Sequence, residues 1–328
     1  MTGVPLDPGT WIGQYEIEKV LGAGGFGITY RAFDHDRKTT VAIKEYFPRS
    51  AAVRNIEDGS VWVPSVEQEP VYRRGLDRFW KEAENLARFH HPHIVGVKQV
   101  FMASGTAYIV LEYIPGQNLE EWAQTAQRQP TQEEFDNFCT ALLSALEIMH
   151  ENKFLHRDLG PKNILLRDGL PVLIDFGSAR IMSAGNIMTA MVTPNYAPYE
   201  QHLTSGQGQG AWTDVYGASA TMYRLLAGRP PVDAVSRALD DSQYEPLAEL
   251  VKGRYRRSFL EALDWGLRVM ARERPQSIAE WRGSLLDGNS VARVVSSGLE
   301  TQLVTAPEPP RPFFDRIRGM LGVRPDDQ

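Results

Sequence analysis

The sequence predicts an α+β protein, with a small strand-rich part followed by a larger helical part. β-Branched and aromatic residues bounded by Gly and Asp predict short strands between residues 15 and 47. From residue 118 onward, apolar residues recur at helical spacing in three long runs. The pattern changes after Pro115, which places the boundary between the two parts near that residue.

In the first part, three strands are expected at residues 15–22, 28–33 and 39–47. Residues 48–75 are interpreted as an irregular insert, in which an Asp-Gly turn closes a small hairpin. A helix is expected over 76–89, because its apolar residues are spaced as on one helical face: Leu76, Phe79, Ala83, Leu86 and Phe89. Two further strand-like runs end with "AYIVLEYI".

In the second part, helical patterns cover residues 133–152, 213–228 and 258–270. Beyond about residue 285 the chain becomes polar and Pro-rich, as in a linker. The segment "FFDRIRGMLGV" near the end predicts a short amphipathic helix, which we expect to pack back on the folded part, with peripheral membrane contact as the alternative. We therefore divide the chain into a lead (1–14), a folded unit (15–285) and a linker with a tail (286–328).

Composition excludes several classes of protein. The 328 residues are 42% hydrophobic, enough for a large core, and the net charge is −6. No basic block alternates with aromatic residues, so no nucleic-acid partner is expected. Cys139 is the only cysteine, which excludes an intrachain disulfide and suits a reducing cytoplasm. The sequence has no signal-peptide pattern, and its most apolar helical run, "FCTALLSALEIM", spans only twelve residues. We therefore expect a cytoplasmic protein without a transmembrane segment.

A glycine-rich segment, "LGAGGFGITY", places Gly22, Gly24 and Gly27 as G-x-G-x-x-G between two predicted strands. Glycine lets backbone N–H groups approach a phosphate without a Cβ in the way. A tight hairpin would need glycines too, so the pattern alone is weak. A dinucleotide-binding loop runs from a strand into a helix. A strand follows here, which favours a flap folded over a nucleotide.

The next motif, "VAIK", carries a lysine on a predicted strand. Ala42 and Lys44 point to the same face, so a flat base could lie against Ala42 while the ammonium reaches phosphates. A lone lysine more often points to solvent. Glu82, however, falls on the apolar stripe of the predicted helix, where an unpaired charge is costly. We expect Glu82 to pair with Lys44.

The third motif is "FLHRDLGPKNILLRDGLPVLIDFGSAR", residues 154–180. Its "RDG" turn predicts a hairpin, at whose open end Asn163 and Asp175 emerge together. One carboxylate and one amide oxygen suit a magnesium ion that also binds phosphate oxygens and water. Asp158, just upstream, is placed to accept a proton from a hydroxyl group. Turn capping would explain one of these residues but not all three.

In combination these motifs resemble a protein kinase of the Ser/Thr type over residues 15–284. The segments "LGAGGFGITY", "VAIKEYFP" and "YAPYEQ" are similar to the eukaryotic-like kinases of bacteria. The resemblance implies a bilobal fold, with an N-lobe over 15–114 and a C-lobe over 115–285. It also implies transfer of the γ-phosphate of ATP to Ser/Thr hydroxyls of protein substrates, autophosphorylation of the activation segment, and a requirement for Mg²⁺, with Mn²⁺ as an alternative ion.

The resemblance assigns further roles. Leu111 would lie beside a hinge, Glu112 and Tyr113, that hydrogen-bonds adenine. Glu200 would pair with Arg274, and Asp214 would hold the catalytic loop. The nucleotide would contact the following set: Leu21, Gly22, Gly24, Gly25, Phe26, Gly27, Thr29, Ala42, Lys44, Leu111, Glu112, Tyr113 and Leu165.

One position departs from the pattern of the family. Most Ser/Thr kinases have a lysine two residues after the catalytic Asp, where this chain has Gly160. Lys162 stands four residues after Asp158, where one group of tyrosine kinases has an arginine with the same task. We interpret Lys162 as supplying the positive charge that is missing at position 160, so that activity is retained. The alternative is that Lys162 faces solvent and the enzyme is weakened. Thr193, which in the family contacts the catalytic Asp, favours Ser/Thr acceptors.

Regulation is also suggested. In similar kinases, an arginine at the position of Arg157 binds a phosphate on the activation loop. We expect Thr189 to be that phosphorylation site, with Ser183 as second candidate. Phosphorylated Thr301 in "ETQLVTAP" would suit a forkhead-associated module, the alternative being a solvated Thr in a disordered linker.

Two other functions compete with an active protein kinase. The first is a pseudokinase, a nucleotide-binding scaffold weakened by Gly160, which would bind nucleotide without turnover. The second is a small-molecule phosphotransferase of the same fold. Thr193, Arg274 and the segment "YAPYEQ" oppose the second, because in the family they shape a platform for a polypeptide.

Overall fold

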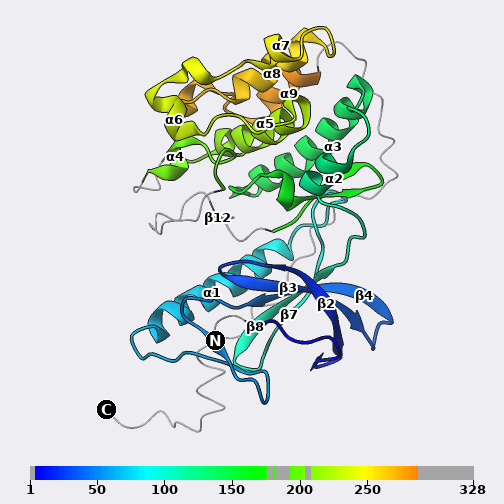
Figure 1. Ribbon diagram of the computed structural model, residues 1–328, viewed down its shortest axis with the longest axis vertical. Coiled ribbons are helices and arrows are strands. Elements are labelled where there is room, and N and C mark those ends of the chain that lie inside the picture. The colour runs from blue at the N-terminus through cyan, green and yellow to red at the C-terminus, as the bar shows by residue number, and fades with distance from the viewer. Residues whose placement is uncertain (1–3, 176–179, 182–192, 204–207, 287–328) are drawn as a thin grey trace. The chain divides into compact units, whose positions relative to one another are not determined.

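A computed structural model describes residues 4–175, 180–181, 193–203 and 208–286, all of which belong to one compact unit, Met1–Ala292 (Figure 1). The expected phosphorylation sites Thr189, Ser183 and Thr301 lie outside these residues, as do the linker and the tail.

The first part of the chain forms a six-stranded antiparallel sheet of order β1-β2-β3-β4-β8-β7. Alternation of buried and half-buried residues along β3 follows the period-two pattern expected of a strand with one face on the core. The strands are β1 (Trp11–Ile12), β2 (Tyr15–Ala23), β3 (Gly27–Asp34), β4 (Thr39–Tyr46), β7 (Val97–Ala103) and β8 (Thr106–Glu112).

Helix α1 (Glu69–Leu86) packs against β7 and β8 of this sheet (Figure 1). It begins seven residues before the predicted helix, so residues 69–75 of the expected irregular insert are helical. Pro70 occupies the first turn, where its missing N–H costs nothing. Gly75 lies inside the helix because a Cβ there would meet the Tyr46 hydroxyl at 2.0 Å. The rest of the insert contains the expected small hairpin, β5 (Val53–Arg54) with β6 (Val61–Trp62).

A buried carboxylate ties this insert to the sheet. Glu45, on β4, is fully buried and accepts hydrogen bonds from the hydroxyls of Tyr30 (2.8 Å) and Tyr108 (2.9 Å). Arg54 of the insert donates to the same carboxylate at 2.6 Å, and its own side chain is only 5% exposed. Arg54 also donates to the carbonyl oxygen of Val4 at 2.8 Å. The lead, the insert and the sheet are therefore joined at one ion pair.

The second part of the chain is mainly helical. Figure 1 shows its helices grouped together, and α5, which is buried along most of its length, packs against α8 and α9. Both α2 and α3 begin with a capping box, at Asn118 and Thr131. The helices are α2 (Leu119–Thr125), α3 (Gln132–Glu151), α4 (Tyr199–His202), α5 (Ala211–Ala227), α6 (Ala234–Leu239), α7 (Leu247–Leu250), α8 (Arg257–Gly266) and α9 (Ile278–Leu286), with 3-10 turns η1 (Pro161–Asn163), η2 (Asp241–Gln243) and η3 (Ala271–Glu273).

Short strands connect the two parts. The expected hairpin around the "RDG" turn consists of β10 (Ile164–Arg167) and β11 (Leu170–Leu173), and β9 (Phe154–Leu155) pairs with β12 (Arg180–Ile181). Leu173 donates its N–H to the carbonyl of His93 (2.9 Å) and accepts from Val95 (3.0 Å), which ties the hairpin to the segment after α1. Within the part of the chain that is described, no helix combines the length and the apolar character needed to cross a membrane.

Candidate active site

Lys44 is the point at which the two parts of the chain meet. Its Nζ lies 2.6 Å from Oδ1 of Asp175 and 3.7 Å from Oε1 of Glu82, and its side chain is 17% exposed. Burial alone would lower the pKa of Lys44, but the charges of Asp175 and Glu82 reverse this and raise it. Burial raises the pKa of Glu82, although Lys44 acts in the opposite sense. Lys44, on strand β4, is therefore held as a cation by Glu82 of helix α1 and by Asp175 just after the hairpin.

The glycine-rich turn covers the end of β4. Its tip is held by backbone hydrogen bonds from Phe47 to Phe26 (3.0 Å) and from Arg49 to Gly25 (3.1 Å). At Gly27 an added Cβ would lie 2.4 Å from the carbonyl oxygen of Glu45, so only glycine fits this close approach. The remaining predicted residues of the turn, Leu21, Gly22 and Gly24, are solvent-exposed, as is Phe26.

The expected adenine site lies where β3, β4 and β8 run side by side. Thr29 pairs with Lys44, and Ala42 pairs with Leu111, while Leu165 lies on β10 of the following part. At the hinge, the N–H of Glu112 donates to the carbonyl of Gly96 at 2.8 Å, so this N–H is not available to a nucleotide.

Side chains also brace the hinge. The Glu112 carboxylate lies 2.7 Å from Nη2 of Arg167 on the hairpin. The ring of Tyr113 lies under the guanidinium of Arg31, at 5.2 Å.

The hairpin brings Asn163 and Asp175 together, because the N–H of Ile174 donates to the carbonyl of Asn163 at 3.0 Å. The amide nitrogen of Asn163 donates to the backbone carbonyl and to Oδ2 of Asp158, both at 2.9 Å, which leaves the amide oxygen for a metal. Asp175 has a φ of 57°, a left-handed conformation that is uncommon for a residue with a Cβ. A carboxylate and an amide oxygen are hard ligands, so this pair fits Mg²⁺ or Mn²⁺.

Asp158 is held by three neighbours. Its Oδ1 accepts from the hydroxyl of Thr193 at 2.7 Å, and its Oδ2 accepts from Asn163. Its backbone N–H donates to Nδ1 of His156 at 3.3 Å. Burial lowers the pKa of His156, so this fully buried ring is a neutral acceptor. Each carboxylate oxygen of Asp158 keeps a lone pair that can accept a further proton.

Beneath this loop, Asp214 of α5 accepts from the backbone N–H groups of His156 (3.0 Å) and Arg157 (2.8 Å). His150 Nε2 lies 2.7 Å from the same carboxylate. Burial alone would raise the pKa of Asp214, but the hydrogen bond and charge of His150 contribute to a net lowering. Asp214 is therefore an ionised, buried anchor of the loop.

A second buried pair supports the helical part. Glu200 accepts from Nη1 of Arg274 at 2.8 Å and from Nη2 at 3.0 Å, a bidentate geometry, and both residues are buried. Thr213 donates to the same carboxylate at 3.0 Å, which joins α4 to α5.

Residues 15–259 match the protein kinase domain family. The chain belongs to this family. It is 32% identical over 236 residues to a carbon catabolite-derepressing protein kinase of Candida albicans, covering 70% of this chain and 35% of that protein. It is 29% identical over 235 residues to the serine/threonine-protein kinase PknJ of Mycobacterium tuberculosis, covering 70% of this chain and 36% of that protein. The chain thus spans about a third of the length of these curated relatives.

Among solved structures, the apo form of PpkA-294 superposes with a TM-score of 0.75 and 34% identity, covering 86% of this chain and 99% of that one. The bilobal kinase fold is therefore confirmed. It places a curled antiparallel sheet in the N-lobe and the helices in the C-lobe.

In this kinase domain, Gly160 lies in extended backbone (φ −148°, ψ 162°). Among the described residues, the three atoms nearest to an added Cβ belong to Tyr196, at 3.7 to 4.0 Å, which is ordinary contact. Lys162 lies in η1 and is solvent-exposed.

Glu120 is a neighbour of Lys162. Burial would raise the pKa of Glu120, but hydrogen bonds from Arg224 and Gln124 reverse that effect. The nearby charge of Lys162 lowers the pKa further. Lys162 is therefore an exposed cation close to an acidic side chain.

Sequence reasoning missed several residues that support the site. Arg167 braces the hinge, His150 binds Asp214, and Gln201 and Gln209 bind Arg157. Gln201 and Arg167 lie within quoted motifs, at the end of "YAPYEQ" and in the "RDG" turn, but neither motif indicates the partner. His150 and Gln209 come from segments without a motif, so their partners follow from the tertiary fold alone.

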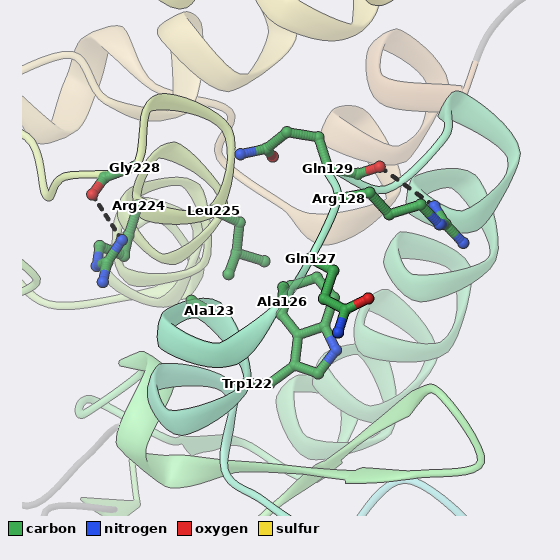
Figure 2. Close-up of a pocket in the computed structure, with 9 residues that line it drawn as sticks. All are labelled: Trp122, Ala123, Ala126, Gln127, Arg128, Gln129, Arg224, Leu225 and Gly228. Atoms are coloured by element: carbon green, nitrogen blue, oxygen red, sulfur yellow. Dashed lines mark hydrogen bonds between the residues drawn. The ribbon is translucent and has the colours of Figure 1, made fainter.

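A cavity of about 270 Å³ between α2, the loop after it and α5 is shown in Figure 2. It adjoins a second cavity of about 440 Å³, with which it shares Trp122 and Leu225. The guanidinium of Arg224 at its edge donates to the carbonyl of Gly228 (2.7 Å) and to Glu120 (2.9 Å), so this cation is already paired (Figure 2). Neither cavity is lined by a predicted site residue, and we assign them no part in phosphoryl transfer.

Proposed function

We propose that this domain is an ATP-dependent protein kinase that transfers the γ-phosphate to Ser or Thr hydroxyls of protein substrates. The observation that supports it most is the convergence of Lys44, Glu82 and Asp175 from three separate segments. A cation held between a helix carboxylate and a metal-binding carboxylate is the arrangement that phosphoryl transfer requires.

The N-lobe would hold and orient ATP. Lys44 donates to the phosphates, and Glu82 keeps the ammonium in place. The glycine-rich turn would lie over the phosphates, where its missing side chains leave room for them. Ala42 of β4 and Leu165 of β10 would contact the faces of the base.

The C-lobe would position the acceptor. Asp158 accepts the hydroxyl proton of the substrate and aligns its oxygen with the γ-phosphorus. Thr193 fixes the orientation of that carboxylate through its 2.7 Å hydrogen bond, which supports Ser/Thr acceptors. Asn163 and Asp175 would hold Mg²⁺ or Mn²⁺, which when bound neutralises charge on the phosphates.

We further propose that Lys162 supplies the positive charge that Gly160 cannot. Lys162 is exposed and lies four residues after Asp158, within reach of a phosphate at the mouth of the site. Its proximity to Glu120 gives it a partner while no substrate is bound. Autophosphorylation of the activation segment, with Thr189 as the first candidate, belongs to the same proposal.

The test is intact-mass spectrometry of the purified chain after incubation with Mg²⁺ and ATP, beside an Asp158→Asn variant. Asn is isosteric with Asp and can still accept from Thr193, so the variant should fold. We expect mass gains of whole phosphate units in the wild type only. If neither protein gains mass or phosphorylates a panel of peptides, although both bind nucleotide, the proposal fails and a pseudokinase remains.

A further inference from the structure

Arg157 immediately precedes the proposed catalytic Asp158. Its backbone has a φ of 70°, in the left-handed region that is costly for a residue with a Cβ. Such a conformation persists only where its surroundings hold it in place. Because Arg157 and Asp158 are adjacent, contacts that fix the backbone of Arg157 also determine the orientation of the Asp158 side chain.

Three groups of Arg157 are held by one stretch of chain, residues 201–214. Its N–H donates to Oδ1 of Asp214 at 2.8 Å. Its carbonyl oxygen accepts from the amide nitrogen of Gln201 at 2.7 Å. Its guanidinium donates through Nη2 to the amide oxygen of Gln209. The two glutamines therefore bind Arg157 in addition to the anchor that Asp214 provides.

The position of Gln209 is fixed by its neighbours. Gly208 has a φ of 84°, and its carbonyl accepts from the indole N–H of Trp212 at 2.8 Å. At Gly210, an added Cβ would lie 2.4 Å from the Trp212 ring. The backbone N–H of Gly210 donates to the hydroxyl of Thr213 at 3.2 Å. Gln209 thus sits between two glycines whose backbones are held by the first turn of α5. This rigidity suits a side chain that must hold another in place.

Gln201 is fixed in a similar way. It follows Glu200, whose carboxylate is bound by Arg274 and Thr213. Both glutamines consequently rest on the same buried framework of α4 and α5.

We propose that Gln209, assisted by Gln201, is a positioning residue that keeps Arg157 and hence Asp158 aligned for transfer in the unphosphorylated kinase. This rests on the proposed function and deepens it, because it assigns a basal activity that needs no phosphate on the activation segment. The neutral amide of Gln209 gives the guanidinium a defined partner from the scaffold of the C-lobe. Phosphorylation then adds to an alignment that already exists.

The test uses the full chain after phosphatase treatment, with Gln209→Ala, Gln209→Glu and Gln243→Ala. Gln243 is an exposed glutamine in η2 and serves as the matched control. Initial rates give kcat and the KM for ATP, and amide hydrogen exchange is followed at His156 and Arg157, whose N–H groups donate to Asp214. Melting temperatures check that each variant is folded.

For Gln209→Ala we expect a fall in kcat of about 10- to 100-fold, the range for losing a hydrogen bond to a charged group, with the KM for ATP unchanged. Exchange at Arg157 should become faster. Gln209→Glu should restore both, because a carboxylate accepts from a guanidinium more strongly than an amide does. Gln243→Ala should behave as the wild type.

Equal exchange at Arg157 in the wild type and in folded Gln209→Ala would overturn the inference, whatever the activities. A kcat reduced equally in Gln209→Ala and Gln209→Glu would also overturn it, because the carboxylate can still accept the guanidinium hydrogen bond. A wild type without turnover would refute the proposed function, while the exchange measurement would still decide whether Gln209 positions Arg157.

Discussion

The proposed role of the Lys162 charge can be tested by removing it and then restoring a lysine at position 160. In the wild type, position 160 is glycine and the nearest lysine in the loop is Lys162. We expect Lys162→Met to lower kcat by about 100- to 1,000-fold, which is the effect of removing one group that stabilises the transition state. This loss in kcat agrees with the interaction of two unit charges about 4 Å apart, which is worth about 4 kcal/mol at an effective dielectric of 20. The free energy of unfolding of Lys162→Met should equal that of the wild type, because Lys162 is exposed.

The second step restores the charge at the position where the family usually has it. Gly160 lies in extended backbone, which any residue adopts, and the nearest described atoms to its added Cβ are those of Tyr196, at 3.7 Å or more. A lysine stem could therefore lie along that ring with its ammonium toward the phosphate. The double variant Gly160→Lys/Lys162→Met should recover most of the lost rate.

The assay is the initial rate of peptide phosphorylation at saturating ATP, supported by single-turnover rates and melting temperatures. Lys252→Met is the matched control, because the Lys252 side chain is 75% exposed and lies 3.9 Å from Glu249. An unchanged kcat in Lys162→Met would refute the relocation. A gain of 100-fold or more in Gly160→Lys alone would also refute it, because it would show that the wild type lacks the charge.

Two further predictions concern stability. Arg54→Met should lower the free energy of unfolding by about 3–5 kcal/mol, because it leaves the buried Glu45 carboxylate without its cation, whereas Arg73→Met, at an exposed helix pair, should cost less than about 0.5 kcal/mol. Urea unfolding of both variants measures this, and equal losses would contradict it. Burial and the neighbouring His93 lower the pKa of His91 to about 4. The folded state then binds fewer protons than the unfolded state between pH 6.5 and 4, so stability falls as the pH drops through this window. His91→Asn should flatten that fall in urea unfolding at a series of pH values, and an unchanged slope would count against it.

Local patterns were enough to predict which residues of the candidate site share a face or lie side by side. Ala42 and Lys44 share a face because side chains alternate along a strand, and this holds in any fold that makes 39–46 a strand. The "RDG" turn likewise fixes the hairpin, and the hairpin brings Asn163 to Asp175. Spacing within one segment is information that a single sequence contains.

The start of α1 could not be predicted in the same way. Gly75 and Pro70 suggested an irregular insert, since glycine and proline usually interrupt helices. Here the glycine makes room for the hydroxyl of Tyr46, which comes from a strand about thirty residues earlier. Gln209 escaped prediction for the same reason, because its partner Arg157 becomes a neighbour only when α5 packs beneath the loop.

The contacts around Asp158 also bear on whether the loss of the usual lysine abolishes the reaction. Positioning of reactants supplies up to about 7–11 kcal/mol of catalysis, whereas a single stabilising donor supplies about 2.7–4 kcal/mol. The groups that would position the substrate hydroxyl are present. Thr193 and Asn163 orient Asp158, and Asp214 holds the backbone of the same loop. Glycine at 160 removes a charge without disturbing these contacts, because the carboxylate is held from other segments. The largest contribution therefore survives, and even without help from Lys162 the expected result is a slow kinase rather than an inert one.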